Sequence, residues 1–266
     1  MTDDARSHVA QVLAAGDLEI SGRLVQASNA TFLAEARDGG TTVPCVYKPV
    51  RGEKPLWDFP TGTLAGREVA AYVVSELGGW DVVPTTVLGD GPFGPGMVQA
   101  WVDVPDDADV VDVVPEGEVP DGWLHVLDAF DERDRPISLV HADDERLRRL
   151  ALFDVVVNNA DRKGGHVLPD ADGNVRGCDH GICFHMEDKL RTVLWGWSDE
   201  ALTDDELTTL GALRVELEEE PVRRRLLGLI SPIEHLALVG RVDALIGSGR
   251  LPEPAGHWPS IPWPAF

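Results

Sequence analysis

The chain has few cysteines: three occur among 266 residues, at Cys45, Cys178 and Cys183. The number is odd and no two of them form a CxxC pair, so the composition does not indicate a disulfide framework. No apolar run reaches the roughly 18 residues that a membrane-spanning helix needs. The N-terminus, MTDDARSHVA, is acidic where a signal peptide is basic and then apolar. We therefore expect a cytoplasmic protein.

Basic residues are also scarce, since 23 Lys and Arg stand against 46 Asp and Glu and the formal net charge is −23. Such a charge opposes non-specific binding to nucleic acid or to anionic lipid surfaces. We expect no nucleic-acid partner and no stable membrane association. The length and the 43% apolar fraction fit one large globular domain or two lobes of ordinary size.

The first hundred residues predict an antiparallel sheet with helices beside it. Apolar residues recur at helical spacing from Asp3 to Ala15 and from Thr61 to Leu77, and glycine follows each pattern. Asp38-Gly39-Gly40 is a hairpin signal between two strand-like runs. Strand-like segments lie at 18–25, 29–36, 42–50, 82–88 and 96–103, which makes about five strands.

The composition changes after Asp103. Residues 105–122 are acidic and contain proline, which favours a surface connection between two lobes. Ser198 and Ser231 are candidate N-caps for the helices that follow. The C-terminal residues are too rich in proline for regular structure, and we expect them to dock through Trp258, Trp263 and Phe266. Helical patterns occur at 122–130, 143–157, 199–217, 221–230 and 231–246.

The stretch from Asn158 to His185 concentrates acids, amides and histidines between two apolar runs. Asp161 and Asp179 flank a hairpin signal at 170–174. Two separated carboxylates of this kind can divide base and metal duties in phosphoryl transfer. Function is therefore expected in this stretch first.

A zinc site is an alternative use of the same stretch. Soft ligands are crowded there, because Cys178, His180, Cys183 and His185 lie within eight residues. Their gaps of two, three and two residues fit neither usual zinc-finger spacing. We prefer to interpret both cysteines as buried strand residues.

Several short motifs resemble one family in their order along the chain. NNADRKGGHVL followed by CDHGICF resembles the catalytic and metal-binding loops of the phosphatidylinositol 3- and 4-kinase-like family, most closely the type II 4-kinases. SNATF is similar to the phosphate-covering loop, VYKPV to the strand that carries the nucleotide-binding Lys, and VVPTTV and MVQAWVD to the strand before the hinge and the hinge. LWGW is similar to a Trp-rich segment of the family. On this resemblance the chain is identified as a bacterial member.

The resemblance implies an α+β, two-lobed protein-kinase-like fold. Residues 1–103 would form an N-lobe built on an antiparallel sheet, and residues 104–266 a mainly helical C-lobe. It also implies binding of ATP with Mg²⁺ or Mn²⁺ and transfer of phosphate to a hydroxyl. Because the net charge of −23 disfavours an anionic membrane lipid, we expect the acceptor to be a protein or a soluble small molecule.

The same resemblance implies roles for individual residues. Lys48 would contact the α- and β-phosphates and pair with Glu68, for which Glu53 and Glu76 are rivals. Asp161 would act as base or orient the acceptor hydroxyl. Arg162 would support that loop. The metal ligands would be Asp179 and His166.

Two further segments would surround the nucleotide. The phosphate-covering residues would be Ser28, Asn29, Ala30 and Thr31, acting through backbone N–H groups. The residues bordering adenine would be Gln99, Ala100, Trp101 and Val102.

One position departs from the family pattern. Five residues after Asp161 the family has a metal-binding Asn, and this chain has His166. Imidazole is a poor partner for Mg²⁺ and suits Mn²⁺ better. A nucleotide-binding pseudokinase that acts as a regulatory interaction module therefore stays open beside the kinase. A nucleotidyl transferase also stays open, because related kinase-like folds transfer the nucleotide when it binds reversed.

Overall fold

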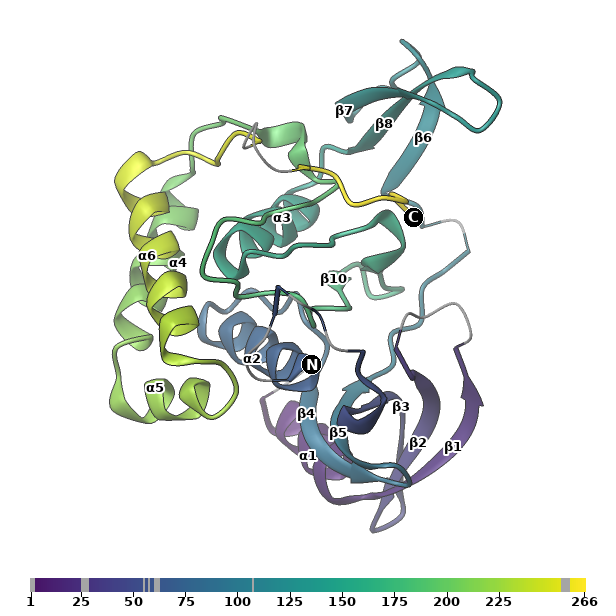
Figure 1. The fold of residues 1–266 in the computed structure, drawn as a ribbon, viewed down its shortest axis with the longest axis vertical. Helices are drawn as coiled ribbons and strands as arrows, with labels where there is room; N and C mark the ends of the chain where they lie inside the picture. Colours follow the sequence, from purple (N-terminus) through teal and green to yellow (C-terminus); the bar gives the residue numbers. More distant parts are fainter. Residues whose placement is uncertain are drawn as a thin grey trace.

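A computed structural model describes residues 3–24, 29–54, 56, 58–59, 63–106, 108–254 and 259–266. Figure 1 shows one antiparallel sheet at the bottom, a group of helices beside and above it, and a second small sheet that stands apart at the top. The predicted α+β class and the antiparallel sheet are confirmed. The division into lobes at residue 103 stays a prediction.

The large sheet has five strands in the order β1-β2-β3-β5-β4, and every neighbouring pair is antiparallel. The turn between β2 and β3 uses Gly39 and Gly40, whose positive φ angles of 53° and 88° favour glycine. Helix α1 (Asp3–Ala15) covers one face and buries Val12 and Leu13 there. The strands are β1 (Asp17–Arg23), β2 (Phe32–Asp38), β3 (Thr41–Pro49), β4 (Thr86–Gly91) and β5 (Gly94–Ala100).

Helix α2 (Leu64–Leu77) joins the sheet to the other helices. It contacts β4 and β5 on one side and α3 (Glu145–Val157) on the other. Its first turn is capped twice, because Thr63 Oγ1 accepts from Gly66 N at 2.9 Å and the Glu53 carboxylate accepts from the N–H groups of residues 64 and 65. Burial on nearly all sides makes α2 a rigid support for the side chains it carries.

Three further helices complete the C-terminal half. They are α4 (Asp204–Glu216), α5 (Glu220–Leu227) and α6 (Pro232–Ser248). Ser231 caps α6 as predicted, in a capping box with Glu234. Ser198 is not an N-cap: α4 begins later, with Thr203 as its cap, and the 3₁₀ turn η3 (Trp195–Trp197) precedes it. No helix among the described residues combines the length and the apolar character needed to cross a membrane.

The prediction of a helix at 122–130 was wrong. These residues form strand β7 (Trp123–Phe130), which pairs with β8 (Pro136–Ala142) in a sheet of order β6-β8-β7, where β6 is Val111–Pro115. A bulge between His125 and Leu127 inserts one residue. Leu124 and Leu127 therefore share a face of the strand at a spacing of three, which imitates a helix.

The stretch 105–122, predicted as a connection, also contains a strand, β6 (Val111–Pro115). The small sheet that results is attached to the rest through His141, which is fully buried. Its Nδ1 lies 2.9 Å from the Ala142 carbonyl and must donate there, so Nε2 accepts from Gly196 N at 2.9 Å. Trp197 adds a second link by donating from Nε1 to Asp143 Oδ1 at 3.0 Å.

The C-terminal residues 259–266 lie on the loop that follows α3. Gly164 N donates to Ala265 O at 2.8 Å, and Thr192 N donates to Ser260 O at 3.0 Å. Trp263 does not dock the segment as predicted, because its side chain is 78% exposed, and Trp258 is outside the described residues. Phe266 does dock as predicted, because its ring packs against Gly164. Backbone bonds, together with Ile261 and Ala265 against the core, also hold the segment.

Candidate active site

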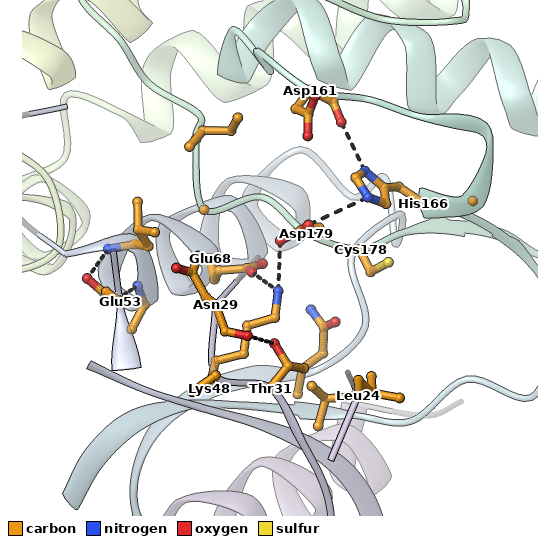
Figure 2. A pocket seen from close by; sticks show the side chains of 18 of the residues that line it. Leu24, Asn29, Thr31, Lys48, Glu53, Glu68, Asp161, His166, Cys178 and Asp179 are labelled. Atoms are coloured by element: carbon orange, nitrogen blue, oxygen red, sulfur yellow. Dashed lines mark hydrogen bonds and ion pairs between the residues drawn. The ribbon is translucent and has the colours of Figure 1, made fainter. Parts of the chain in front are cut away.

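A pocket of about 670 Å³ opens between the five-stranded sheet and the loops after α3, a size typical of small-molecule sites. One loop runs through Asp161 to His166, and the other begins after the short hairpin of β9 (Val167–Pro169) and β10 (Val175–Gly177). In Figure 2, Lys48 rises from the sheet towards Glu68 and Asp179, while Asp161 and His166 lie on the opposite side. The hairpin predicted at 170–174 is present.

Lys48 is the centre of the pocket's polar groups. Its Nζ donates to Glu68 Oε1 at 2.7 Å and to Asp179 Oδ1 at 2.8 Å. The three residues come from β3, from α2 and from the loop after β10, so only the folded chain brings them together. Glu68 is held from behind, because its Oε2 accepts from His180 N at 2.8 Å.

The rival acids predicted for Lys48 lie elsewhere. Glu53 lines the pocket, but its carboxylate caps the first turn of α2 through bonds of 3.0 and 2.8 Å. Glu76, at the far end of the same helix, lies 3.4 Å from Arg6. Glu68 is therefore the acid that pairs with Lys48.

Within this cluster, Lys48 and Asp179 each stabilise the charged form of the other. Burial acts to lower the pKa of Lys48, but Asp179 and Glu68 raise it well above its usual value, so the ammonium stays charged. Lys48 in turn holds the pKa of Asp179 well below its usual range, against the effect of burial. The carboxylate is therefore ionised. Because the Asp179 side chain is 49% exposed, the carboxylate is also open to a ligand.

Asp161 lies across the pocket from Lys48. Burial raises the pKa of its carboxyl, and the cations Lys163 and Arg191 oppose the rise. Arg191 donates to Oδ1 at 3.3 Å, and Lys163 Nζ lies 4.0 Å from Oδ2. Asn159 Oδ1 accepts from Asp161 N at 3.0 Å and fixes the turn. The arrangement presents a carboxylate to the pocket from a braced loop.

Arg162 does not reach the pocket. It is fully buried, and its guanidinium bonds to both carboxylate oxygens of Asp154, at 2.9 and 3.3 Å from Nε. The same group donates to His166 O, to Cys178 O and to His180 Nε2 at 2.6 Å. Arg162 thus ties the two pocket loops to α3 and to each other, and a direct contact with substrate is excluded by its burial.

Sequence reasoning assigned no role to two residues that complete this brace. Asp154 was visible only as a carboxylate inside an otherwise apolar helix. Gly177 leaves room for Arg162, because a Cβ atom there would lie 2.8 Å from the guanidinium. A buried acid at a helical core position is the one signal that could have indicated the brace in advance.

His166 faces Asp179 with an unprotonated nitrogen. Its Nδ1 lies 2.9 Å from Asp161 O and 3.5 Å from Lys163 N; the shorter contact is to a carbonyl, which only accepts, so we assign the hydrogen to Nδ1. Burial lowers the pKa of the ring, which keeps it neutral. Nε2 therefore points a lone pair at Asp179 Oδ2, 3.5 Å away. Two electron-pair donors facing one another in this way suit a shared cation.

The remaining predicted residues line the pocket at its edges. These include Asn29, Ala30 and Thr31, and Asn29 Oδ1 accepts from Lys54 N at 2.9 Å. Ser28 is outside the described residues. The pocket is also lined by Gln99, Ala100, Trp101 and Val102.

The four side chains proposed as zinc ligands do not form a metal site. Across the described part of the chain, no three His, Cys, Asp or Glu side chains are grouped so as to hold a metal ion. His180 Nε2 is occupied by Arg162, and His185 Nδ1 accepts from Glu187 N at 3.0 Å. Cys183 is a buried free thiol. It lies outside regular structure, in the loop after β10, and Cys178 is only partly buried there, so neither is the buried strand residue predicted.

The sequence and the fold were compared with those of known proteins. No protein-family model matches it. The crystal structure of a Helicobacter pylori proinflammatory kinase, CtkA, covers 89% of this chain and 94% of that one, with 13% identity and a TM-score of 0.38. Protein Rv2133c of Mycobacterium tuberculosis is 51% identical over 264 residues, which cover 96% of this chain and 94% of that protein. The chain therefore belongs to the family of Protein Rv2133c.

Proposed function

We propose that the protein is an ATP-dependent phosphotransferase that transfers phosphate to a hydroxyl of a protein or a soluble small molecule. The supporting observation is the position of Lys48, fixed at 2.7 Å from Glu68 and 2.8 Å from Asp179 on the floor of a pocket large enough for a nucleotide. One fixed cation beside an ionised, half-exposed carboxylate is what a polyphosphate and its counter-ion require.

In this proposal Lys48 binds the α- and β-phosphates while Glu68 keeps its ammonium in place. The side chain of Glu68 is 2% exposed and is held by a backbone bond, so it can orient Lys48 without itself meeting the ligand. Asp161 orients the acceptor hydroxyl and takes its proton. Arg191 and Lys163 beside it favour the ionised form that such a base needs.

A divalent cation fits between Asp179 and His166, by the chemistry of the two facing donors. Asp179 supplies an oxygen and His166 supplies Nε2, whose tautomer is set by the bond from Nδ1 to Asp161 O. When bound, the ion supplies positive charge that offsets the charge developing on the phosphate oxygens. Two protein ligands leave positions for phosphate and water, as is usual for Mg²⁺, whereas the nitrogen donor favours Mn²⁺.

The acceptor is assigned only by class. The loop motifs resemble type II phosphatidylinositol 4-kinases, yet the net charge of −23 disfavours approach to an anionic membrane. A hydroxyl on a protein or a soluble molecule meets no such repulsion.

Labelled ATP tests the reaction. Purified protein is incubated with Mg²⁺ or Mn²⁺ and with ATP carrying the label at the γ- or the α-phosphate. We expect transfer or release of the γ-label, and its loss in Asp161→Asn and in Asp179→Asn. Asp205→Asn makes the same chemical change at an exposed position on α4 and should retain the wild-type rate. Turnover that survives both pocket substitutions would refute the proposal.

Nucleotide binding without turnover is the second candidate, and His166 in place of Asn is the observation that favours it. ATP binding measured by calorimetry, with no release of either label, would support a pseudokinase. Appearance of the α-label on protein would indicate nucleotidyl transfer. Absence of any nucleotide binding would contradict the phosphotransferase, the pseudokinase and the nucleotidyl transferase alike.

A further inference from the structure

The wall of the pocket at the end of β5 contains a buried amide, the side chain of Gln99. It is 5% exposed and lies directly across the strand pair from Thr86 on β4. Gln99 Nε2 donates to Thr86 Oγ1 at 2.8 Å, and Thr86 is itself 1% exposed. Polar side chains this deeply buried are oriented by their partners, so each bond determines which atom faces the pocket.

A short relay of hydrogen bonds sets the orientation of the amide. Thr86 Oγ1 lies 2.7 Å from Pro84 O. A carbonyl oxygen has no hydrogen to give, so the hydroxyl hydrogen of Thr86 is used in that bond. Thr86 can then only accept from Gln99, which must offer Nε2 and not Oε1. The orientation therefore follows from the proline carbonyl.

The other end of the amide is left as an acceptor in the pocket. Gln99 lines the same cavity as Lys48, and Gln99 pairs in register with Val46, two residues before Lys48. Within the described residues Oε1 has no hydrogen-bond partner, and it is not among the polar atoms enclosed without one. It is thus open to whatever occupies the pocket.

We propose that Gln99 Oε1 selects the base of the nucleotide by accepting a hydrogen bond from its exocyclic amino group. The inference rests on the proposed function, which places a nucleoside triphosphate in this pocket. A 6-aminopurine offers a donor to Oε1, whereas a 6-ketopurine sets an oxygen against it. Thr86 is a positioning residue, since it acts only through the amide. Preference for adenine over hypoxanthine or guanine follows from this relay.

The size of the effect can be estimated. A hydrogen bond between neutral groups changes an affinity by about tenfold, and a buried acceptor facing another acceptor loses at least that much. If Gln99 and Thr86 only brace β4 against β5, their substitution changes stability without changing which base is preferred. The ratio of two affinities therefore separates recognition from bracing.

Calorimetry with the β,γ-imido analogues of ATP and ITP, which differ at position 6 of the base, tests the proposal. Gln99→Met keeps the volume and removes the acceptor, and we expect the affinity ratio of the two analogues to fall by about tenfold. Thr86→Val removes the hydroxyl and frees the amide to turn, so the inosine analogue should bind more tightly. Thr86→Ser keeps the hydroxyl and should retain the wild-type ratio.

The outcomes separate this inference from the proposed function. If neither analogue binds the wild-type protein, the proposed function fails and the base recognition fails with it. If both bind and the ratio is the same in wild type, Gln99→Met and Thr86→Val, the relay does not read the base while nucleotide binding stands. Thermal unfolding of each variant confirms that the ratio is measured on folded protein.

Discussion

Two charged clusters lie close together in this protein and differ in their access to solvent. In one, the side chains of Arg162 and Asp154 are both 0% exposed, and their bonds go to protein atoms. In the other, Lys48 contacts a buried acid, Glu68, and a half-exposed one, Asp179. Both side chains of the first, closed cluster are buried, whereas the second, open cluster exposes the Asp179 carboxylate to the pocket.

The two clusters therefore have different roles. The buried one holds the pocket loops in place, and the half-exposed one offers charged groups to a ligand. A buried ion pair gives little net stability, but the loss of one partner leaves a charge without compensation. Arg162 connects α3 with both pocket loops, so its bonds fix the distance between Asp161 and Asp179. Lys48 leaves Asp179 partly open to solvent, which allows a ligand to join the cluster. Variants of the two clusters should therefore differ in kind.

The largest effect is expected from the closed cluster. Arg162→Met leaves Asp154 buried and unpaired, which should lower the free energy of unfolding by about 3–5 kcal/mol. The double variant with Asp154→Leu removes both charges and should recover much of the loss. Urea denaturation followed by circular dichroism measures both. A single variant within about 1 kcal/mol of wild type would contradict the role of the brace.

In the open cluster the main effect of substitution should be on activity. Lys48→Met removes the fixed cation, and we expect phosphate transfer to fall on the order of 10²- to 10³-fold. The thermal unfolding temperature should fall less than in Arg162→Met. Glu68, the buried acid that loses its cation, keeps its bond from His180 N and can bind a proton in place of carrying a charge, since burial already raises its pKa. Arg37→Met, an exposed cation on β2 of the same sheet, is the matched control. Equal activity in the two variants would remove Lys48 from the proposed chemistry.

His166 lies between the clusters and should alter the choice of metal. His166→Asn replaces a nitrogen donor that faces Asp179 at 3.5 Å with the amide oxygen that Mg²⁺ prefers. We expect the affinity for Mn²⁺ relative to Mg²⁺ to fall by about tenfold, measured by titrating Mn²⁺ by paramagnetic resonance with and without competing Mg²⁺. An unchanged preference would show that the ring does not touch the ion.

The smallest effect lies outside both clusters, at His141. Burial lowers the pKa of this ring from its usual 6.5, so the folded protein favours the neutral form that accepts from Gly196 N. Its contribution to stability is complete above pH 6.5 and decreases as the pH falls towards the folded-state pKa. In His141→Gln the slope of stability against pH below 6.5 should be smaller, by no more than about 1.4 kcal/mol per pH unit. Equal slopes in the wild type and the variant would show that protonation of His141 is not coupled to unfolding.

Local patterns predicted most of the elements, missed the short strands β6 and β8, and mistook one irregular strand for a helix. The five strands of the large sheet and its turn at Gly39 and Gly40 follow from alternation and turn chemistry. Strand β7 was mistaken for a helix because its bulge changes the spacing of Leu124 and Leu127. A bulge depends on the partner strand, and a single segment of sequence does not contain that partner.

Asp161 and Asp179 were singled out from the sequence itself, because they flank a hairpin signal in one stretch of about 20 residues, where order along the chain limits distance in space. Lys48, Glu68 and His166 were found by resemblance, and only the fold decided between Glu68 and its two rivals. Likewise, sequence placed Arg162 in the loop, while burial alone showed that it faces Asp154 and not the pocket. Sequence by itself determined which chemical groups the protein has and which elements carry them. Tertiary structure decided which groups meet and which face solvent, because contact and burial depend on segments more than a hundred residues apart, such as Lys48 and Asp179.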